Sequence, residues 1–240
     1  HVLFLLMKLM VLEHAELIRA ALEDSAVNVG SWVEHGRIDA PGALAALGLD
    51  AAPQLSSLSP SSAQTLGGEL ITLTGSDLSG VTDVRVGGVS ADDVTVLSDT
   101  TVELRAPLAP LLGPVQVVVE KGAQVSNGLA FAYAETDPPR VLAAASVAAG
   151  QPFQWTLGAQ PLEAAWLLVG FSPTTVSFKG HELLASFVSL WNGVLDSRGL
   201  VELPVTLPPG IGPLTLYSQV VSVGVDGLDV SAAVTTTITP

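Results

Sequence analysis

Histidine and cysteine, the side chains that most often act as catalytic bases, nucleophiles and transition-metal ligands, are scarce in this sequence. Cysteine is absent, so disulfide bonds, thiolate metal sites and cysteine nucleophiles are excluded. The four histidines are His1, His14, His35 and His181. A serine nucleophile needs a histidine base and an acid that orients this base, and no Gly-x-Ser-x-Gly motif accompanies the histidines. We therefore predict no catalytic residues and no cofactor-binding residues in this chain.

Two short acidic segments contain oxygen ligands of the kind that calcium prefers. Asp92 and Asp93 are adjacent, and Asp226 and Asp229 flank a Gly-Leu pair. Calcium takes about six to eight oxygen ligands, and neither segment has the pattern of an EF-hand loop. Because aspartate is a common turn residue, we expect two solvated turns and predict no metal site.

Three tryptophans, Trp155, Trp166 and Trp191, are candidates for stacking on sugar rings. Trp155 alternates with Phe153 among apolar neighbours, which favours a place in the core. An open row of tryptophans on one face of a sheet would indicate carbohydrate binding. Buried tryptophans would argue against it.

The charge of the chain excludes several classes of partner. There are 23 acidic and 9 basic residues, which give a net charge of −14. An acidic surface repels phosphate backbones and anionic lipid head groups, so we expect no nucleic-acid partner and no binding to a membrane surface. The apolar stretch 1–12 is shorter than the about 20 residues that a bilayer-spanning helix needs, so we also expect no membrane span.

Hydrophobic periodicity divides the chain into three predicted domains. Residues 1–49 have helical spacing, whereas residues 53–134 and 140–240 contain short alternating runs separated by turn residues, the pattern of a β-sandwich. An extra helix at 183–190 is an alternative to a further strand, and no internal sequence repeat is evident. We predict a mainly β protein, with two sandwich-like domains after a short helical segment. The alternating runs are 69–74, 83–86, 93–96, 101–105, 114–119, 130–133, 152–157, 164–169, 199–204, 214–220 and 233–238.

The middle segment has an ordered series of turns and strands. It begins with "LSSLSPSSAQTLGGELITLTGSDL", continues with "VTDVRVGGVSADDVTVLSDTTVELRAP" and ends with "GPVQVVVEKGAQVSNGLAFAY". Gly87-Gly88 allows the positive φ angles of a tight hairpin turn, and Phe131 and Tyr133 point to one face, where they can fill the core of a sandwich. This series resembles the IPT/TIG family, whose members have an immunoglobulin-like fold. The resemblance implies a non-catalytic binding or spacer module at 53–134.

The first segment resembles the C-terminal end of a subtilisin-like serine protease. The stretch "AELIRAALEDSAVNVGSWVEHGRIDAPGALAAL" follows the closing pattern of that family, and His1-Val2 matches the tail of the motif that holds its nucleophile. The resemblance implies that the nucleophile lies upstream of residue 1, so we expect the chain to be part of a longer protein. The last segment, through "LDSRGLVELPVTLPPGIGPLTLYSQ", is similar to β-rich C-terminal modules of secreted bacterial proteins.

These features lead to one main expectation and two alternatives. We expect a non-catalytic ancillary region of a secreted or cell-surface bacterial protein, with immunoglobulin-like modules that act as spacers, adhesion surfaces or protein-binding sites downstream of a truncated protease domain. One alternative is that the chain is part of an active serine endopeptidase whose catalytic residues lie upstream. The other is a carbohydrate-binding module in the C-terminal domain. Protein or carbohydrate ligands at the cell surface are therefore the expected partners.

Overall fold

The structure is a computed structural model, and it describes residues 15–20, 23 and 51–240. Residues 15–20 are helical, and Arg19 forms ion pairs there with Glu16 at 2.6 Å and Glu23 at 3.9 Å. The rest of the predicted segment 1–49 lies outside the described residues, together with most of the protease resemblance, His1, His14 and His35. Contacts within the chain define two units, His1–Ala52 and Pro53–Pro240, and the second is described here.

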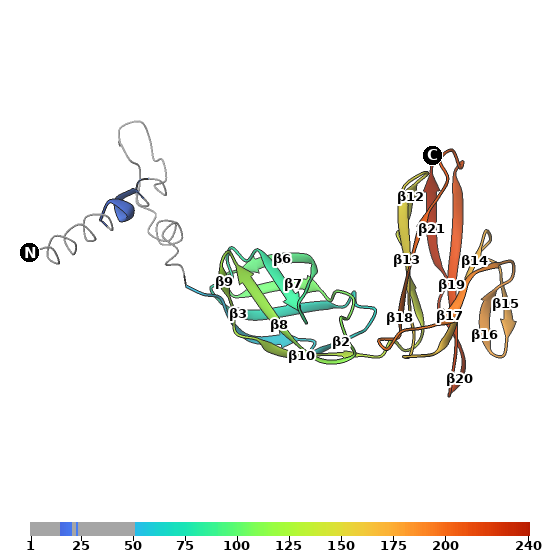
Figure 1. The fold of residues 1–240 in the computed structure, drawn as a ribbon, viewed down its shortest axis with the longest axis horizontal. Coiled ribbons are helices and arrows are strands. Elements are labelled where there is room, and N and C mark those ends of the chain that lie inside the picture. Colours follow the sequence, from blue (N-terminus) through green and yellow to red (C-terminus); the bar gives the residue numbers. More distant parts are fainter. Residues whose placement is uncertain (1–14, 21–22, 24–50) are drawn as a thin grey trace, which may run out of the picture. The chain divides into compact units, whose positions relative to one another are not determined.

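The first part of this unit is a sandwich of two sheets (Figure 1). One sheet has the strand order β1-β3-β7-β6, and the other has the order β2-β10-β8-β4-β5, with β9 paired to β8. The strands are β1 (Gln54–Ser59), β2 (Ser62–Gln64), β3 (Leu70–Ser76), β4 (Asp83–Val86), β5 (Val89–Ser90), β6 (Asp92–Ser98), β7 (Thr101–Arg105), β8 (Gly113–Lys121), β9 (Gln124–Val125) and β10 (Leu129–Ala134).

Alternation along the strands builds the core of this sandwich. Ile71 and Leu73 of β3 are buried while the residues between and beside them are more exposed, as expected when one face of a sheet packs inward. Phe131 and Tyr133 are buried on the same face of β10, and their rings meet edge to face at 5.3 Å. The Tyr133 hydroxyl donates a hydrogen bond to the Pro107 carbonyl oxygen at 2.8 Å. Burial raises the pKa of Tyr133, so its phenol stays a neutral donor.

The turn between β4 and β5 follows the sequence prediction. Gly87 and Gly88 have φ angles of 61° and 86°, the left-handed conformation at both central positions of a type I′ hairpin turn. A side chain at position 87 would also collide with Pro110 and Val115. Glycine is therefore required at Gly87 by both backbone conformation and space.

The second part of the unit is another sandwich (Figure 1). A sheet of order β11-β13-β18 faces a sheet of order β12-β21-β19-β14-β17, in which β20 pairs with β19; β15 and β16 form a separate hairpin. The strands are β11 (Arg140–Leu142), β12 (Ser146–Ala148), β13 (Pro152–Gly158), β14 (Ala164–Gly170), β15 (Thr175–Phe178), β16 (His181–Leu184), β17 (Val188–Val194), β18 (Leu200–Thr206), β19 (Leu214–Gly224), β20 (Gly227–Val230) and β21 (Val234–Thr239). The prediction of a mainly β fold with immunoglobulin-like sandwiches is confirmed.

The alternative of a helix at 183–190 is wrong. This stretch forms the end of β16, a short connection and the start of β17. The fully buried amide of Gln219 holds the hairpin to the sheet, because its Oε1 accepts the Leu184 N–H at 3.1 Å and its Nε2 donates to the carbonyl oxygens of Glu182 at 2.7 Å and Ser231 at 2.9 Å. Tertiary hydrogen bonds thus override the local pattern of the sequence.

The two sandwiches share one strand plan that the sequence does not reveal. In each, the first strand is divided: β1 and β11 pair antiparallel with β3 and β13, while β2 and β12 pair parallel with the last strands β10 and β21. The long strands β8 and β19 each pair with the last strand, with β4 or β14, and with a short strand, β9 or β20. The equivalent of β7 is β18, and the equivalent of β5 is β17.

Two differences separate the strand plans. Strand β6 covers the edge of β7 in the first sandwich and has no equivalent in the second, so β18 ends its sheet. Strand β17 has seven residues where β5 has two, and the β15–β16 hairpin precedes it. The second sandwich therefore has two edge strands of seven residues each, β17 and β18, on the side that β6 closes in the first.

Candidate binding cleft

A cleft of about 320 Å³ lies between the edge strands β17 and β18 of the second sandwich. Its floor comes from Trp155 of β13 and Leu167 of β14, which belong to the buried core. Its walls come from the two edge strands. The lining residues are Trp155, Leu167, Leu190, Trp191, Leu203, Pro204 and Val205.

The floor of the cleft is buried and has no free polar group. Trp155 is 2% exposed, as predicted from its alternation with Phe153, and the two rings meet edge to face at 4.5 Å. The indole N–H of Trp155 donates a hydrogen bond to the Ser218 hydroxyl at 2.8 Å. Because this donor is already used, Trp155 offers only apolar surface to a ligand.

The wall on β17 contains a partly buried tryptophan and an exposed leucine. The Trp191 ring lies over Gly193, where an added Cβ would stand 2.5 Å from the ring atom Cζ2. Leu190 is the extra residue of a β-bulge, because Trp191 pairs with Leu167 whereas Ser189 pairs with Leu168. Leu190 is 54% exposed although it lines the cleft. The bulge therefore places an apolar side chain at the mouth of the cleft.

The backbone of β17 offers unpaired groups along its outer edge. The Leu195 N–H donates to the Glu163 carbonyl oxygen at 2.9 Å, so these two residues form a hydrogen-bonded pair directly beyond the pairing of Val194 in β17 with Ala164 in β14. In an antiparallel ladder, residues whose backbone groups point inward alternate with residues whose backbone groups point outward. The backbone N–H and C=O groups of Trp191 and Gly193 therefore bond to β14. The N–H and C=O groups of Asn192 and Val194 then point to the outer edge.

The backbone of β18 is less available. The Ala159 N–H donates to the Gly199 carbonyl oxygen at 3.0 Å. The same alternation therefore directs the backbone groups of Leu200, Glu202 and Pro204 to the outer edge. Both backbone groups of Leu200 are hydrogen-bonded to Asp196, and Pro204 has no N–H. An added strand would therefore find few donors on β18.

A tight turn joins the two walls of the cleft. The Asp196 carboxylate accepts hydrogen bonds from the backbone N–H groups of Arg198 at 2.8 Å and Leu200 at 3.0 Å, and it forms an ion pair with the Arg198 guanidinium at 2.8 Å. Partial burial alone raises the pKa of Asp196, but the hydrogen bonds from Leu200 and Arg198 outweigh it, so the pKa lies below its ordinary value. The ionised carboxylate of Asp196 thus holds the turn that joins β17 to β18.

The other candidate residues of the sequence do not form a site. The prediction that Asp92 and Asp93 lie in a turn is wrong, because both belong to β6, where Asp93 forms an ion pair with Arg105 at 3.6 Å. Asp226 lies in the turn before β20 and Asp229 in β20 itself, so that prediction is half right. No group of three or more metal-binding side chains occurs among residues 15–20, 23 and 51–240.

The three candidate tryptophans, all within the described residues, do not form an open row on one face. Trp191 pairs with Leu167, whereas Trp166 pairs with Asn192, so Trp166 and Trp191 lie on opposite faces of their sheet. His181 lines a separate pocket beneath the β15–β16 hairpin, together with Glu182 and the Gln219 side chain whose hydrogen bonds hold the hairpin. Neither arrangement is a row of rings for a sugar chain.

Comparison with known proteins identifies the first sandwich. The model of the IPT/TIG domain family matches residues 53–133. Residues 53–133 are an IPT/TIG domain. This confirms the IPT/TIG resemblance of the middle segment, whereas no comparison supports the protease resemblance of the first segment. No curated protein matches the chain.

Several solved structures are similar to the chain over most of its length. A protein solved with a xylogluco-oligosaccharide is 16% identical, with 77% of this chain and 41% of that chain covered and a TM-score of 0.32. The adhesin InvE of Yersinia pseudotuberculosis is 19% identical, with 78% and 58% covered and a TM-score of 0.28. SGBP-B of a Bacteroides ovatus mixed-linkage glucan utilization locus, solved with a mixed-linkage heptasaccharide, is 17% identical, with 78% and 46% covered and a TM-score of 0.29. This chain thus spans about half the length of these proteins, and TM-scores this low carry no functional argument.

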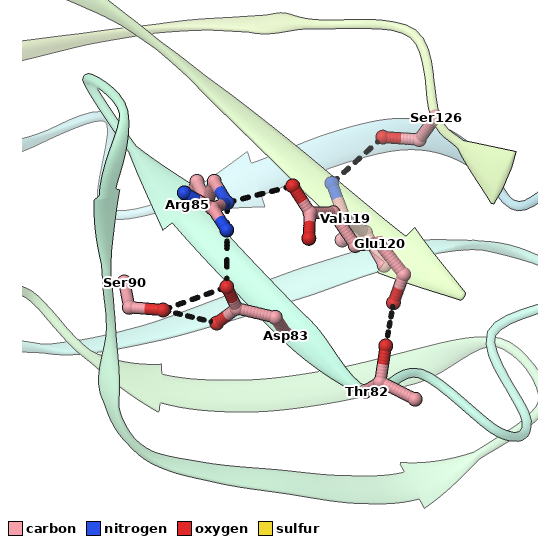
Figure 2. A network of polar contacts seen from close by, with 7 residues as sticks. All are labelled: Thr82, Asp83, Arg85, Ser90, Val119, Glu120 and Ser126. Carbon is pink, nitrogen blue, oxygen red and sulfur yellow. Dashed lines mark hydrogen bonds and ion pairs between the residues drawn. The ribbon is translucent and has the colours of Figure 1, made fainter. Parts of the chain in front are cut away.

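The IPT/TIG domain contains a polar network that stabilises its sheet. Asp83 of β4 and Glu120 of β8 stand directly opposite each other, a placement that is unfavourable for two like charges. Figure 2 shows Arg85 joined to both, with its Nε 2.6 Å from a Glu120 carboxylate oxygen and 3.4 Å from one of Asp83. Ser90 of β5 also donates to Asp83 at 2.6 Å. The network is explained by the pairing of β4, β5 and β8, and needs no ligand.

Proposed function

We propose that this chain is a non-catalytic binding region, and that the cleft of its second sandwich receives apolar side chains of a protein partner. The proposal treats residues 53–134 and 140–240 as separate domains, with the IPT/TIG domain as the spacer or adhesion module and the second sandwich as the ligand-binding module. One observation supports it most: all seven residues that line the cleft are of apolar or aromatic type, and one wall carries an accessible Trp191.

The lining of the cleft favours a protein partner over a carbohydrate. A sugar ring stacks on an aromatic side chain but also needs hydrogen-bonding groups around it, because buried polar groups without partners cost about 1–3 kcal/mol each. Among the lining residues, only the two tryptophans have a polar side-chain group, and the Trp155 N–H is already bonded to Ser218, so the Trp191 N–H is the one side-chain donor left for a sugar and there is no side-chain acceptor. An apolar side chain gains from leaving water at roughly 25 cal/mol per Å² of buried area. Aromatic and aliphatic anchors in pockets are typical of protein interfaces.

Two finer parts of the proposal rest on the sequence alone. A place outside the cell or at its surface is supported by the acidic, cysteine-free composition. A position downstream of a subtilisin-like protease domain is supported only by the residues of the stretch 1–47. The coding sequence upstream of residue 1 tests the second part: a Gly-Thr-Ser-Met motif there would support it, and an unrelated sequence would contradict it.

Two binding assays test the central part of the proposal. One is selection from a displayed library of random peptides, and the other measures binding to a panel of soluble polysaccharides. The informative variant is Leu190→Glu, which places a charge at the mouth of the cleft. Its control is Val225→Glu, which changes another exposed apolar residue of the same sandwich, 98% exposed, outside the cleft. We expect selected peptides to bind the unchanged chain and Val225→Glu but to lose at least tenfold in affinity for Leu190→Glu. Polysaccharide binding that Leu190→Glu abolishes would contradict the proposal and favour the carbohydrate alternative.

A further inference from the structure

The long edge strands of the two sandwiches differ in how they are protected from added strands. An unprotected edge pairs readily with another chain, and proteins block edges with charges, proline, bulges or covering groups. The edge of β1 is covered by Asn127, whose side-chain amide accepts from the Leu55 N–H at 2.8 Å and donates to the Leu55 carbonyl oxygen at 2.9 Å. Strand β6 carries two aspartates and two register shifts. Strand β18 carries Glu202 and Pro204 on its outer edge.

Strand β17 lacks most of these devices. Its sequence, VSLWNGV, contains no charged residue and no proline. Its single bulge, at Leu190, leaves the segment Trp191–Val194 in regular register with β14. At this segment, the outward backbone groups of Asn192 and Val194 lie beside the apolar cleft. Backbone groups that pair and a cleft that receives a side chain are together the two parts of a strand-addition site.

The register of β17 decides which side chains of an added strand would reach the cleft. Side chains directly opposite each other in a ladder share one face of the sheet. Trp191 faces the core side, because it pairs with Leu167, and Gly193 pairs with Ala165 on the same face. A partner residue opposite Gly193 would meet no side chain there except the Trp191 ring that lies over this glycine. The apolar side chain opposite Gly193 or Trp191 is thus the one placed over the cleft.

The charges of the second sandwich and of the whole chain indicate the chemistry of the partner outside the cleft. Glu182 on β16 and Glu202 on β18 are exposed, while Arg198 is paired with Asp196. The whole chain has a net charge of −14, so a second acidic copy would be repelled, whereas lysine or arginine next to the paired segment would be attracted.

We infer that β17 binds an extended segment of another protein by antiparallel strand addition, which closes the side of the sandwich that β6 closes in the IPT/TIG domain. The segment has apolar residues at alternate positions, one of which fills the cleft, and basic residues at its ends. The inference rests on the proposed function and specifies how the same cleft recognises its partner.

The test uses the whole chain and a synthetic peptide, Lys-Lys-Thr-Val-Thr-Leu-Thr-Val-Thr-Lys-Lys. In one derivative, N-methyl groups replace the amide hydrogens along one edge of the extended peptide, and in a second derivative they replace those along the opposite edge. Each modification blocks strand pairing on its own edge and leaves the side chains unchanged. We expect binding by the parent peptide, at least tenfold weaker binding by one methylated derivative, and little change with the other. On binding, the amide hydrogens of Asn192 and Val194 should exchange more slowly with solvent.

A pair of protein variants separates the backbone from the side chain. Asn192→Pro removes an outward N–H, whereas Asn192→Ala keeps it, and the Asn192 side chain that both variants replace is exposed. We expect at least tenfold weaker peptide binding for Asn192→Pro and less than twofold for Asn192→Ala. Circular dichroism melting tests whether both variants fold.

The remaining outcomes overturn strand addition in different ways. Binding that Leu190→Glu weakens but that neither methylated peptide nor Asn192→Pro changes would leave the cleft as the site and contradict strand addition. If the parent peptide fails to bind while library-selected peptides still bind at the cleft, strand addition is likewise contradicted and the cleft remains the site. Dimerisation of the chain through β17 in sedimentation measurements would contradict a partner of different sequence. Loss of all peptide binding, selected peptides included, would overturn the proposed function itself.

Discussion

At the scale of single residues, stability depends on a few buried polar groups with defined partners. The Tyr133 hydroxyl is an example, because it is buried and satisfies the carbonyl group of Pro107. Tyr133→Phe would leave that carbonyl without a partner, and we expect it to lower the free energy of unfolding by about 1–3 kcal/mol. Urea denaturation measures this loss. Tyr217→Phe, at a partly exposed tyrosine of the second sandwich, is the control, and an equal loss in both variants would contradict the explanation.

Asp196 makes a pH-dependent contribution to stability. Its pKa is lowered in the folded state, so the stabilisation is present above the ordinary aspartate pKa of about 4 and is lost as the pH falls through the lowered value. We expect Asp196→Asn to destabilise the chain near pH 7 and the difference from the unchanged chain to shrink toward pH 2. Thermal melting across this range measures it. For comparison, Asp226→Asn, at an exposed acid, should change stability by less than about 0.5 kcal/mol near pH 7. A difference for Asp196→Asn that grows in acid would be the opposite of our expectation.

At the scale of elements, the β15–β16 hairpin depends on one side chain. Gln219→Leu would leave the Leu184 N–H and the carbonyl groups of Glu182 and Ser231 without their partner. We expect it to destabilise the hairpin by about 2 kcal/mol or more and to speed amide exchange at Leu184, measured by mass spectrometry or NMR. Gln154→Leu, at an exposed glutamine bonded to Glu202, is the control. Unchanged exchange at Leu184 would show that the hairpin is held by other contacts.

Elements with strong local patterns could be predicted from the sequence, and the others could not. Strands β4 and β7 coincide with the predicted runs 83–86 and 101–105, because alternation and the flanking turn residues agree. The stretch 183–190 has no alternation that separates helix from strand, and its structure is decided by Gln219, about thirty residues away. Trp191 could be named as a candidate, but the cleft beside it depends on the pairing of β17 and β18 with distant strands.

At the scale of the whole molecule, the shared strand plan explains where the cleft lies. The sequence shows no repeat because the plan is set by which strands pair, and the two sandwiches use different turns and core residues for the same pairings. The loss of a β6 equivalent and the lengthening of β17 occur on one side of the second sandwich. That combination exposes an edge and the tryptophan floor together, and no local pattern predicts it.

The separation of the chain into two units predicts the effect of a truncation. Contacts separate His1–Ala52 from Pro53–Pro240, so removal of residues 1–52 should leave the sandwiches folded. We expect the fragment 53–240 to keep its β-sheet circular dichroism spectrum and its cooperative melting, and to be more soluble without the apolar stretch 1–12. Loss of cooperative melting in this fragment would contradict the prediction. Among the residues that the structure describes, no helix is long and apolar enough to cross a membrane.

The most direct measurement of the central claim is NMR of the indole N–H groups during titration with a selected partner peptide. The chain has four tryptophans, and Trp191 and Trp166 lie on opposite faces of the same sheet, so one reports on the cleft and the other is an internal control. Trp→Phe variants assign the signals. We predict that the Trp191 signal shifts with the bound fraction while the Trp166 signal stays in place. A shift of Trp166 without a shift of Trp191 would contradict binding at this cleft.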